Sequence, residues 1–208
     1  MIIDLYGMPG SGKSTVCNYL EQNLEFKNVK NWYIEKTIGK IIFHLYLYLF
    51  FLDKTSRKKY KEIMKIIDNK KAYKNYINSN VNISLYIKYM LFDYYLERKN
   101  IKKIIIDEGI IHYSISLYVE FNLEKEKIMK IIELLKLNNV KYIGLKIDIE
   151  ESKKNIKKRN RKRCPIDFLN DNELDKFLKK WIEGITLISD RYILLEQKDL
   201  INYIKEEQ

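Results

Sequence analysis

The stretch GMPGSGKST occupies residues 7–15 and directly follows MIIDLY. Its spacing, G-x-x-x-x-G-K-S, places Gly7, Gly10 and Gly12 where the backbone must curl so that successive N–H groups converge on phosphate oxygens. MIIDLY is short, apolar and β-branched, which predicts a buried strand, and the pattern over 13–25 predicts a helix. A glycine-rich loop between a strand and a helix N-terminus is a binding site for phosphate groups.

The polar residues of this loop fit a nucleoside triphosphate with its metal ion. We expect Lys13 to contact the β- and γ-phosphates and the hydroxyl group of Ser14 to coordinate Mg²⁺. The cofactors implied by the loop are therefore ATP and Mg²⁺. The alternative is a glycine turn without chemistry, but strand, loop and helix are all in the required order. The residues expected to bind the nucleotide are Gly7, Gly10, Ser11, Gly12, Lys13, Ser14 and Thr15.

The composition indicates one globular domain spanning 1–208. A chain of 208 residues with 46% apolar and 13% aromatic residues is long enough to bury a core and is not disordered. The net charge of +11 comes from lysines spread over the whole sequence. Bound nucleotide phosphates and solvated lysines explain this charge more simply than a nucleic-acid partner.

The cysteines and the first residues predict a location in the cytoplasm. Cys17 and Cys164 are the only cysteines, and their spacing fits neither a metal site nor a secreted disulfide framework. Residues 1–6 lack the basic segment of a signal peptide.

Apolar runs flanked by charge alternate with helical patterns after the loop. Such runs are typical of parallel strands buried on both faces, so the chain predicts a doubly wound α/β/α sandwich with a five-stranded parallel sheet. Strands are expected at 1–6, 31–35, 102–109, 140–148 and 191–196. Helices are expected at 13–25, within 37–98 with breaks near 53–55 and 78–80, at 110–121 and 124–138, from about 150 into 157–165, and at 171–189 and 198–207.

The helical region 37–98 contains the most apolar segment, IIFHLYLYLFFL at 41–52. Twelve residues are too few to cross a bilayer, so we expect a core helix there, with a dimer contact or a membrane-surface contact as alternatives. The region is rich in tyrosine and is expected to form part of a pocket for a phosphoryl acceptor. Tyr86, Tyr89 and Tyr94, at helical spacing, are nevertheless more typical of a core.

Carboxylates end two of the expected strands, at the edge where ligands bind in such sheets. Asp107 follows the buried run IIID and is the expected Mg²⁺ partner of Ser14, directly or through water. Glu108 is a candidate to polarise water or to contact the acceptor. Glu35 ends NWYIE and is expected to accept the proton from an attacking hydroxyl group. For both glutamates the alternative is a solvated acid at a strand end.

Arginine is rare in this chain and clustered at one place. Three of only six arginines, Arg159, Arg161 and Arg163, lie within five positions. Guanidinium groups match phosphate oxygens bidentately, so we expect a lid at about 155–168 that closes over the transferring group and excludes water. Arg159 and Arg161 are the expected catalytic arginines, and Arg163 is expected to bind the nucleotide. The alternatives are a solvated helix end and a nucleic-acid patch.

This set of residues resembles the P-loop nucleoside and nucleotide kinases, in particular the thymidylate kinase and deoxynucleoside kinase group. GMPGSGKST is similar to the small-molecule kinase form of the loop. The stretch NIKKRNR, 155–161, is similar to the lid signature E-R-I-x-x-R-x-R, with Ile156, Arg159 and Arg161 in place and Asn155 where the signature has arginine.

The resemblance implies a P-loop NTPase fold and an ATP-dependent kinase that phosphorylates a nucleoside, a nucleotide or a related small acceptor. It implies that Glu35 is the catalytic base and that LLEQKD, 194–199, forms the loop beside the adenine ring. Asp-Glu-Gly at 107–109 stands where the family has an acid, an arginine and a serine, which removes an arginine from the acceptor pocket.

The sequence is also compatible with two other functions and with a homodimer. A nucleotide-dependent switch or regulatory ATP-binding protein needs no small-molecule acceptor, although the N-K-x-D motif of a GTPase is not found after a late strand. A kinase acting on nucleic-acid ends is compatible with the basic charge.

Overall fold

The structure is a computed structural model that describes residues 1–29, 53–67, 83–99, 103–159 and 165–207. The predicted strand at 31–35, the predicted core helix at 41–52, the expected break at 78–80, and Glu35, Arg161 and Arg163 lie outside the described residues. The elements are β1 Ile2–Gly7, α1 Lys13–Asn23, β2 Lys27–Asn28, α3 Lys54–Ile67, α4 Ile83–Arg98, β3 Ile104–Ile106, α5 Ile110–Phe121, α6 Lys125–Leu135, β4 Val140–Leu145, α7 Ile149–Arg159, the 3₁₀ turn η2 Pro165–Phe168, α8 Asp171–Thr186, β5 Ile193–Leu195 and α9 Gln197–Glu206.

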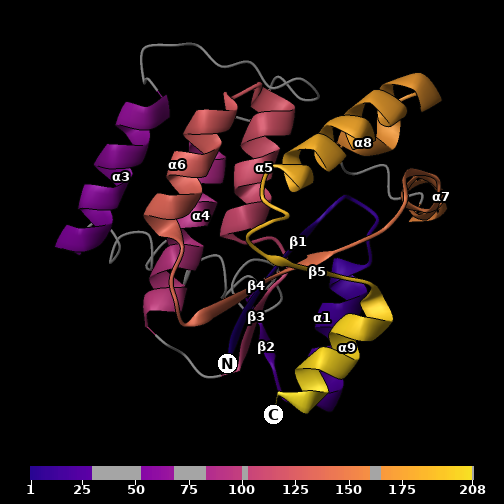
Figure 1. Cartoon of the computed structure of the whole chain (residues 1–208), viewed down its shortest axis with the longest axis horizontal. Coiled ribbons are helices and arrows are strands. Elements are labelled where there is room, and N and C mark those ends of the chain that lie inside the picture. Colours follow the sequence, from indigo (N-terminus) through magenta and orange to yellow (C-terminus); the bar gives the residue numbers. More distant parts are fainter. Residues whose placement is uncertain (30–52, 68–82, 100–102, 160–164, 208) are drawn as a thin grey trace.

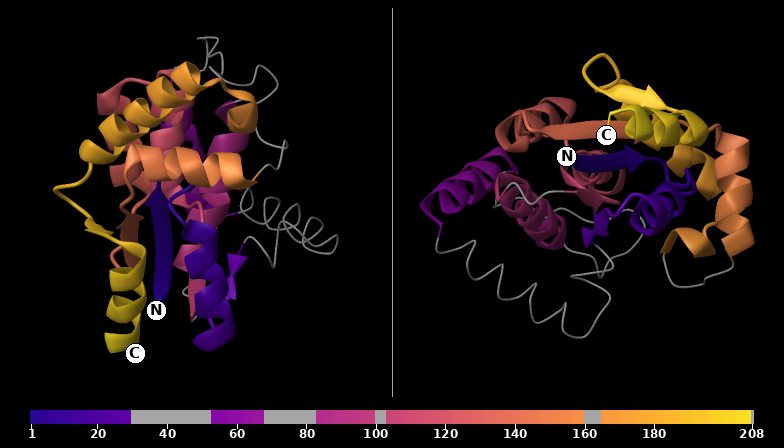
Figure 2. Two further views of the ribbon diagram at one scale, coloured as in Figure 1. Left: turned by 90° about the vertical axis from the view of Figure 1, so that its right-hand side faces the viewer. Right: turned by 90° about the horizontal axis from the view of Figure 1, so that it is seen from below.

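The strands form one parallel sheet in the order β2-β3-β1-β4-β5, with β1 at its centre (Figure 1). Asp4 is in register with Ile106 of β3, and Gly7 with Leu145 of β4. Because the strands are parallel, their carboxyl ends share one edge of the sheet, and α7 and α8 lie beyond that edge (Figures 1 and 2). The predicted five-stranded doubly wound fold is confirmed.

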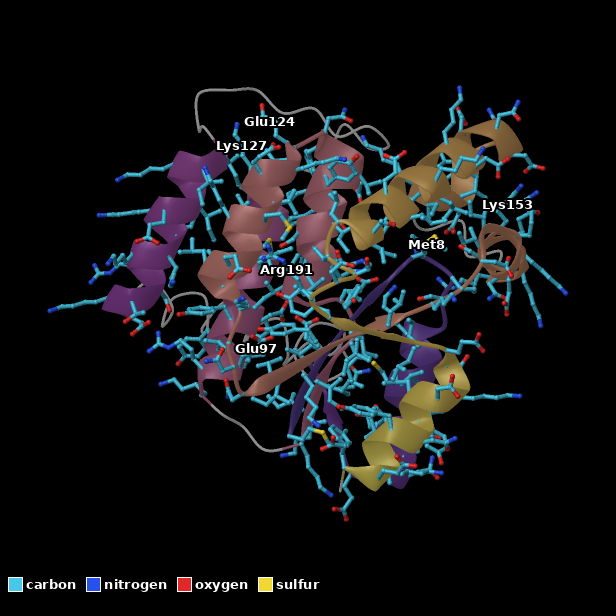
Figure 3. All side chains as sticks on the ribbon, in the orientation of Figure 1. Met8, Glu97, Glu124, Lys127, Lys153 and Arg191 are labelled. Atoms are coloured by element: carbon cyan, nitrogen blue, oxygen red, sulfur yellow. The ribbon has the colours of Figure 1, made fainter. Side chains whose placement is uncertain are left out.

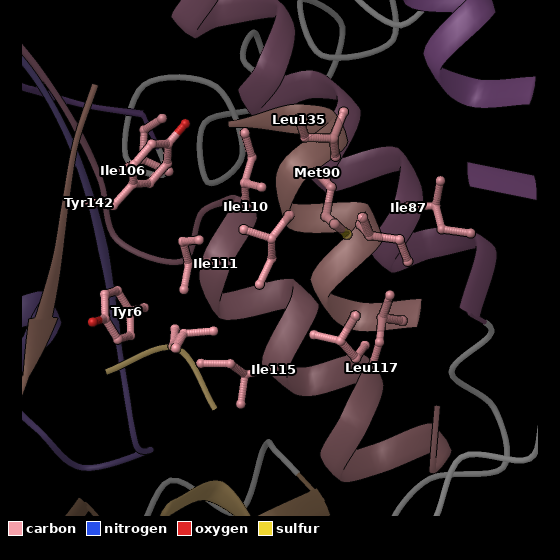
Figure 4. Packing of buried hydrophobic residues seen from close by; sticks show 14 of the residues in the cluster. Tyr6, Ile87, Met90, Ile106, Ile110, Ile111, Ile115, Leu117, Leu135 and Tyr142 are labelled. Atoms are coloured by element: carbon pink, nitrogen blue, oxygen red, sulfur yellow. The ribbon is translucent and has the colours of Figure 1, made fainter. Parts of the chain in front are cut away.

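Alternation along β1 sends side chains to two different cores. Ile3 and Leu5 pack with α1 and α9 on one face of the sheet. Ile2 and Tyr6 point to the other face, where α5 packs between the sheet and α4 and α6 (Figure 4). Such alternation requires a strand that is buried on both faces. The sheet is therefore covered by a helical layer on each side, which leaves its edges and strand ends for ligands.

Several element boundaries differ from the sequence-based expectation. The sheet includes a short strand at Lys27–Asn28 that the sequence did not predict. It follows Glu25, whose left-handed backbone, φ 58°, lies just after the end of α1 at Asn23 and stops the helix short of the expected residue 25. Helix α6 ends at Leu135 rather than near 138, because Lys136 is extended at ψ 145°.

Helix α8 also ends early, at Thr186, and residues 187–190 form turns before β5. Within the described ranges, no helix combines the length and the apolar character that a bilayer crossing requires.

Candidate functional site

The loop between β1 and α1 has the curled backbone that its glycines predict. Gly10 has φ +85°, and a Cβ atom there would lie 2.8 Å from the carbonyl oxygen of Ser152. Lys13 is buried inside the loop, and its Nζ atom donates hydrogen bonds to the carbonyl oxygens of Gly7 at 2.9 Å and Met8 at 3.2 Å. The loop therefore carries one enclosed positive charge at the N-terminus of α1, where helix geometry already favours an anion.

Helix α7 holds the far side of this loop through two side chains. Ser152 Oγ donates to the carbonyl oxygen of Pro9 at 2.6 Å, and Asn155 Nδ2 donates to that of Gly10 at 3.0 Å. Lys153, labelled in Figure 3, forms an ion pair with Asp175 of α8 at 2.8 Å. Sequence reasoning missed Ser152 altogether and treated Asn155 only as a departure from the lid signature. Because Ser152 and Asn155 are three residues apart, they lie on one face of the helix, and this spacing could have indicated that both contact the same segment.

Asp107 lies at the carboxyl end of β3, where the sequence predicts a metal partner. The carboxylate is 2% exposed, and Ser14 Oγ donates to its Oδ2 atom at 2.9 Å. A hydroxyl oxygen and a carboxylate oxygen are the hard ligands that Mg²⁺ takes from a protein, together with water and substrate phosphates. The pair therefore fits Mg²⁺ by its chemistry and by its place beside the loop.

The segment after β3 is held in place by Asp4 of the neighbouring strand β1. Its Oδ2 atom accepts a hydrogen bond from the N–H of Ile110 at 2.8 Å, and its side chain is fully buried. Gly109 passes so close that a Cβ atom there would lie 2.2 Å from Asp4 Oδ1. Burial raises the pKa of Asp4 to about 8, although the backbone N–H groups of 109–111 oppose the rise. Sequence reasoning missed Asp4, because a strand pattern does not show what a side chain caps.

A first cavity of about 410 Å³ opens between the loop and helices α4, α5 and α8. Tyr86 and Tyr89 line it, whereas Tyr94 is not among its lining residues and is buried. The residues that line this cavity include Gly10, Gly12, Lys13, Ser14, Tyr86, Tyr89, Asp93, Asp107, Glu108, His112, Tyr113, Glu120 and Arg159.

The wall of the first cavity is aromatic and carries several acids. The rings of Tyr89 and Tyr113 stack at 5.4 Å and 13°. Tyr86 donates from its hydroxyl group to Glu120 Oε2 at 2.7 Å. A stacked aromatic wall with hydrogen-bonding groups suits a flat, polar small molecule.

Glu108 faces the same cavity at its loop end. Its Oε1 atom lies 3.8 Å from His112 Nε2, and its side chain is 38% exposed. Burial raises the pKa of Tyr113 well above its ordinary value, and the charges of Glu108 and Asp93 add to the rise. The two carboxyl groups and this phenol therefore belong to one electrostatic cluster.

A second cavity of about 910 Å³ lies on the other side of the loop. Ser11 and Thr15 line it together with 146–148 after β4 and 196–198 after β5. The latter range lies within the stretch 194–199 that the kinase resemblance assigns to the adenine side. Gly10, Gly12 and Arg159 line both cavities, so the two spaces meet at the loop.

The structure thus brings together many of the residues singled out from the sequence. Lys13, Ser14 and Asp107 are neighbours, and Arg159, the last residue of α7, reaches the junction of the two cavities. Glu35, Arg161 and Arg163 lie outside the described residues.

Comparison with known proteins identifies the fold. No protein-family model and no curated protein sequence matches the chain. Among solved structures, it is similar to a deoxyadenosine kinase from M. mycoides with the products dCMP and a flexible dCDP bound, at 17% identity and a TM-score of 0.56 over 100% of this chain and 98% of that one. The same kinase with bound dATP gives 16% identity and 0.54, with the same shares covered.

A second neighbour leads to the same fold. The YorR protein from Bacillus subtilis, in complex with phosphorylated GDP, matches at 14% identity and a TM-score of 0.52 over 100% of this chain and 97% of that one. The five-stranded parallel sheet and its helices are those of the P-loop kinase fold.

Proposed function

We propose that the protein is an ATP-dependent small-molecule kinase that transfers the γ-phosphoryl group to a nucleoside, a nucleotide or a related acceptor. The observation that carries this proposal is the pair of cavities that meet at Gly10, Gly12 and Arg159. A donor in the second cavity would direct its phosphates along the loop into the first. An acceptor in the first cavity would then meet the terminal phosphoryl group. The structural neighbours support this reading, since they share the fold and hold nucleotides.

Each loop-end group has a part in such a transfer. Lys13 and the loop N–H groups hold the β- and γ-phosphates, and Ser14 and Asp107 hold Mg²⁺, which neutralises charge on the phosphates. Arg159 stabilises charge on the transferring group, with Arg161 of the proposed lid 155–168 in the same role, and Arg163 of that lid binds the nucleotide.

The chemical step forms one bond to phosphorus, breaks another, and requires a base when the acceptor is a hydroxyl group. An acceptor oxygen forms a bond to the γ-phosphorus while the bond from that phosphorus to the β,γ-bridging oxygen breaks, and ADP leaves. For a hydroxyl acceptor, the proton passes to a carboxylate, for which Glu35 and Glu108 are the candidates.

The first cavity favours transfer over a nucleotide-dependent switch. A switch needs a nucleotide site and a partner surface, and a cavity lined by Tyr86, Tyr89 and Tyr113 beside the γ-phosphate position serves neither purpose. Positioning and charge neutralisation supply most of the catalysis in phosphoryl transfer, and the first cavity provides the positioning of the acceptor.

Replacement of Lys13 tests the proposed function. We expect Lys13→Ala to reduce phosphoryl transfer by about 100-fold or more, as for loss of a group that stabilises transition-state charge. The measurement is transfer of label from γ-labelled ATP to a panel of nucleosides, nucleotides and sugars. Lys130→Ala, on the exposed side of α6, is the matched control and should keep full activity. A wild-type protein that labels no acceptor, or a Lys13→Ala variant that retains full transfer, would contradict the proposal.

A further inference from the structure

The position of the loop fixes which residues border the reacting group of an acceptor. The terminal phosphoryl group of a donor must lie beside Lys13, and Ser14 Oγ is 2.9 Å from Asp107 Oδ2. Glu108 follows Asp107 directly and lines the first cavity. The acceptor atom that attacks the phosphorus therefore lies next to Asp107 and Glu108.

The charges around the first cavity are unevenly distributed. Among its described lining residues, the lysine and arginine are both on the loop side, where the donor phosphates need them. Away from the loop, the charged residues of the wall are acids, which come from α4, α5 and the end of β3. The lining cations are Lys13 and Arg159, and the lining acids are Asp93, Asp107, Glu108 and Glu120.

The carboxyl group of Asp93 shows that a further negative charge is unfavourable in this cavity. It is 4% exposed and lines the cavity, and within the described part of the chain it has no hydrogen-bond or ion-pair partner. Burial, and then the charges of Asp4 and Glu108, hold the pKa of its carboxyl group well above the usual range. This rise in pKa favours the protonated form of Asp93, which offers a neutral hydrogen-bonding group to a ligand.

A phosphomonoester acceptor would bring up to two negative charges to the same wall. We propose that Glu108 is a specificity-determining residue that selects a neutral, hydroxyl-bearing acceptor and rejects a phosphomonoester at the reacting position. This inference rests on the proposed kinase function and names its acceptor class. Like charges a few ångströms apart in a partly buried site produce discrimination of at least about 10-fold.

Matched pairs of acceptors test the role of Glu108. The probes are deoxyadenosine, deoxycytidine, deoxyguanosine and thymidine, each compared with its own 5′-monophosphate. Dissociation constants are measured by calorimetry with the full chain saturated with a non-hydrolysable ATP analogue and Mg²⁺. We expect the wild type to bind at least one nucleoside about 10-fold or more tightly than its monophosphate.

Two substitutions and a control separate charge from structure. Glu108→Gln should reduce the preference for the nucleoside several-fold, and Glu108→Arg should bring the monophosphate to equal or tighter binding. Glu124→Gln changes the net charge by the same amount as Glu108→Gln. Glu124, at the start of α6 (Figure 3), lines neither cavity, so this control should leave the ratio unchanged.

Three results would overturn the inference: tighter or equal binding of monophosphates by the wild type, a ratio that Glu108→Gln leaves unchanged, or no binding of any of the eight probes. Because the readout is binding, the outcome is separable from that of the proposed function. A wild type that discriminates in this way but transfers no phosphoryl group would contradict the kinase proposal, and Glu108 would then select between ligands rather than between acceptors.

Discussion

The carboxyl group of Asp4 accepts a hydrogen bond from the N–H of Ile110, a residue 106 positions further along the chain. Ile110 is the first residue of α5, and its N-cap residue, Gly109, has no side chain with which to cap the helix. Asp4 supplies from the neighbouring strand the acceptor that a helix N-terminus needs. It thereby fixes the short segment that presents Asp107 and Glu108 to the first cavity.

Removal of this acceptor should loosen the segment. We expect Asp4→Ala to lower the free energy of unfolding by about 1–3 kcal/mol, because a buried N–H group loses its partner. The exchange of the Ile110 amide hydrogen should become faster, as measured by hydrogen–deuterium exchange.

The isosteric variant is the control for this prediction. Asp4→Asn keeps an oxygen acceptor at the same place, so slow exchange at Ile110 should be retained. Equally fast exchange in both variants would mean that the hydrogen bond does not hold the segment.

At the scale of whole elements, α7 forms one wall of the phosphate-binding loop. Ser152 and Asn155 bond to consecutive carbonyl groups of 9–10, and the same helix ends at Arg159 between the two cavities. A shift of α7 therefore changes the shape of the loop and the position of the arginine together.

The bond from Ser152 gives a direct test of this coupling. Ser152→Ala removes a buried hydroxyl group and leaves the carbonyl group of Pro9 without that donor, which costs about 1 kcal/mol. We expect the affinity for MgATP to fall about 3- to 10-fold, as measured by calorimetry. Ser189→Ala removes a comparable hydroxyl group that bonds to Thr186 in an exposed turn, and it should leave the affinity unchanged. Equal affinities in the two variants would contradict the coupling.

Sequence and structure agree best where local pattern carries the information. Asp107 and Ser14 could be paired in advance, because one ends a buried strand and the other follows a phosphate-binding loop. The position of Asp93 and Tyr113 in the first cavity could not be predicted, because helical spacing indicates that a side chain is buried without indicating which cavity it faces. The bond between Ser152 and Pro9 depends on how α7 crosses the sheet, which no local pattern encodes.

Across the whole molecule, several acids buried in β1 and α4 favour their protonated forms. Burial is the first cause of the raised pKa values of Asp4, Asp93 and Glu97. Glu97 also accepts a hydrogen bond at 3.1 Å from the hydroxyl group of Tyr142, a strand residue in register with Asp4. Acids whose pKa values are lowered, such as Glu133, are exposed and remain ionised in both folded and unfolded protein above about pH 5.

The stability of the protein should therefore fall as the pH rises from about 5 to about 8. The folded pKa of Asp4, about 8, exceeds its unfolded value of 3.8, so the folded state binds more protons in this interval. Each such group contributes a slope of about −1.4 kcal/mol per pH unit until the pH passes its folded pKa.

Urea unfolding at several pH values measures this slope. Below pH 8, Asp4→Asn should make the slope less steep by the contribution of one titrating group. A wild-type stability that is constant or rises over this range would contradict the assignment.

The meeting of two cavities at Gly10, Gly12 and Arg159 also has a consequence for inhibitor design. A single molecule that joins an adenosine polyphosphate to an acceptor would occupy both spaces at once. Because its two ends are tethered across a junction of only three residues, each end raises the local concentration of the other. Such a bivalent ligand would gain roughly 10²- to 10⁴-fold in affinity over either half when its linker matches the span. The linker length that gives the highest affinity would therefore measure the distance between the two cavities.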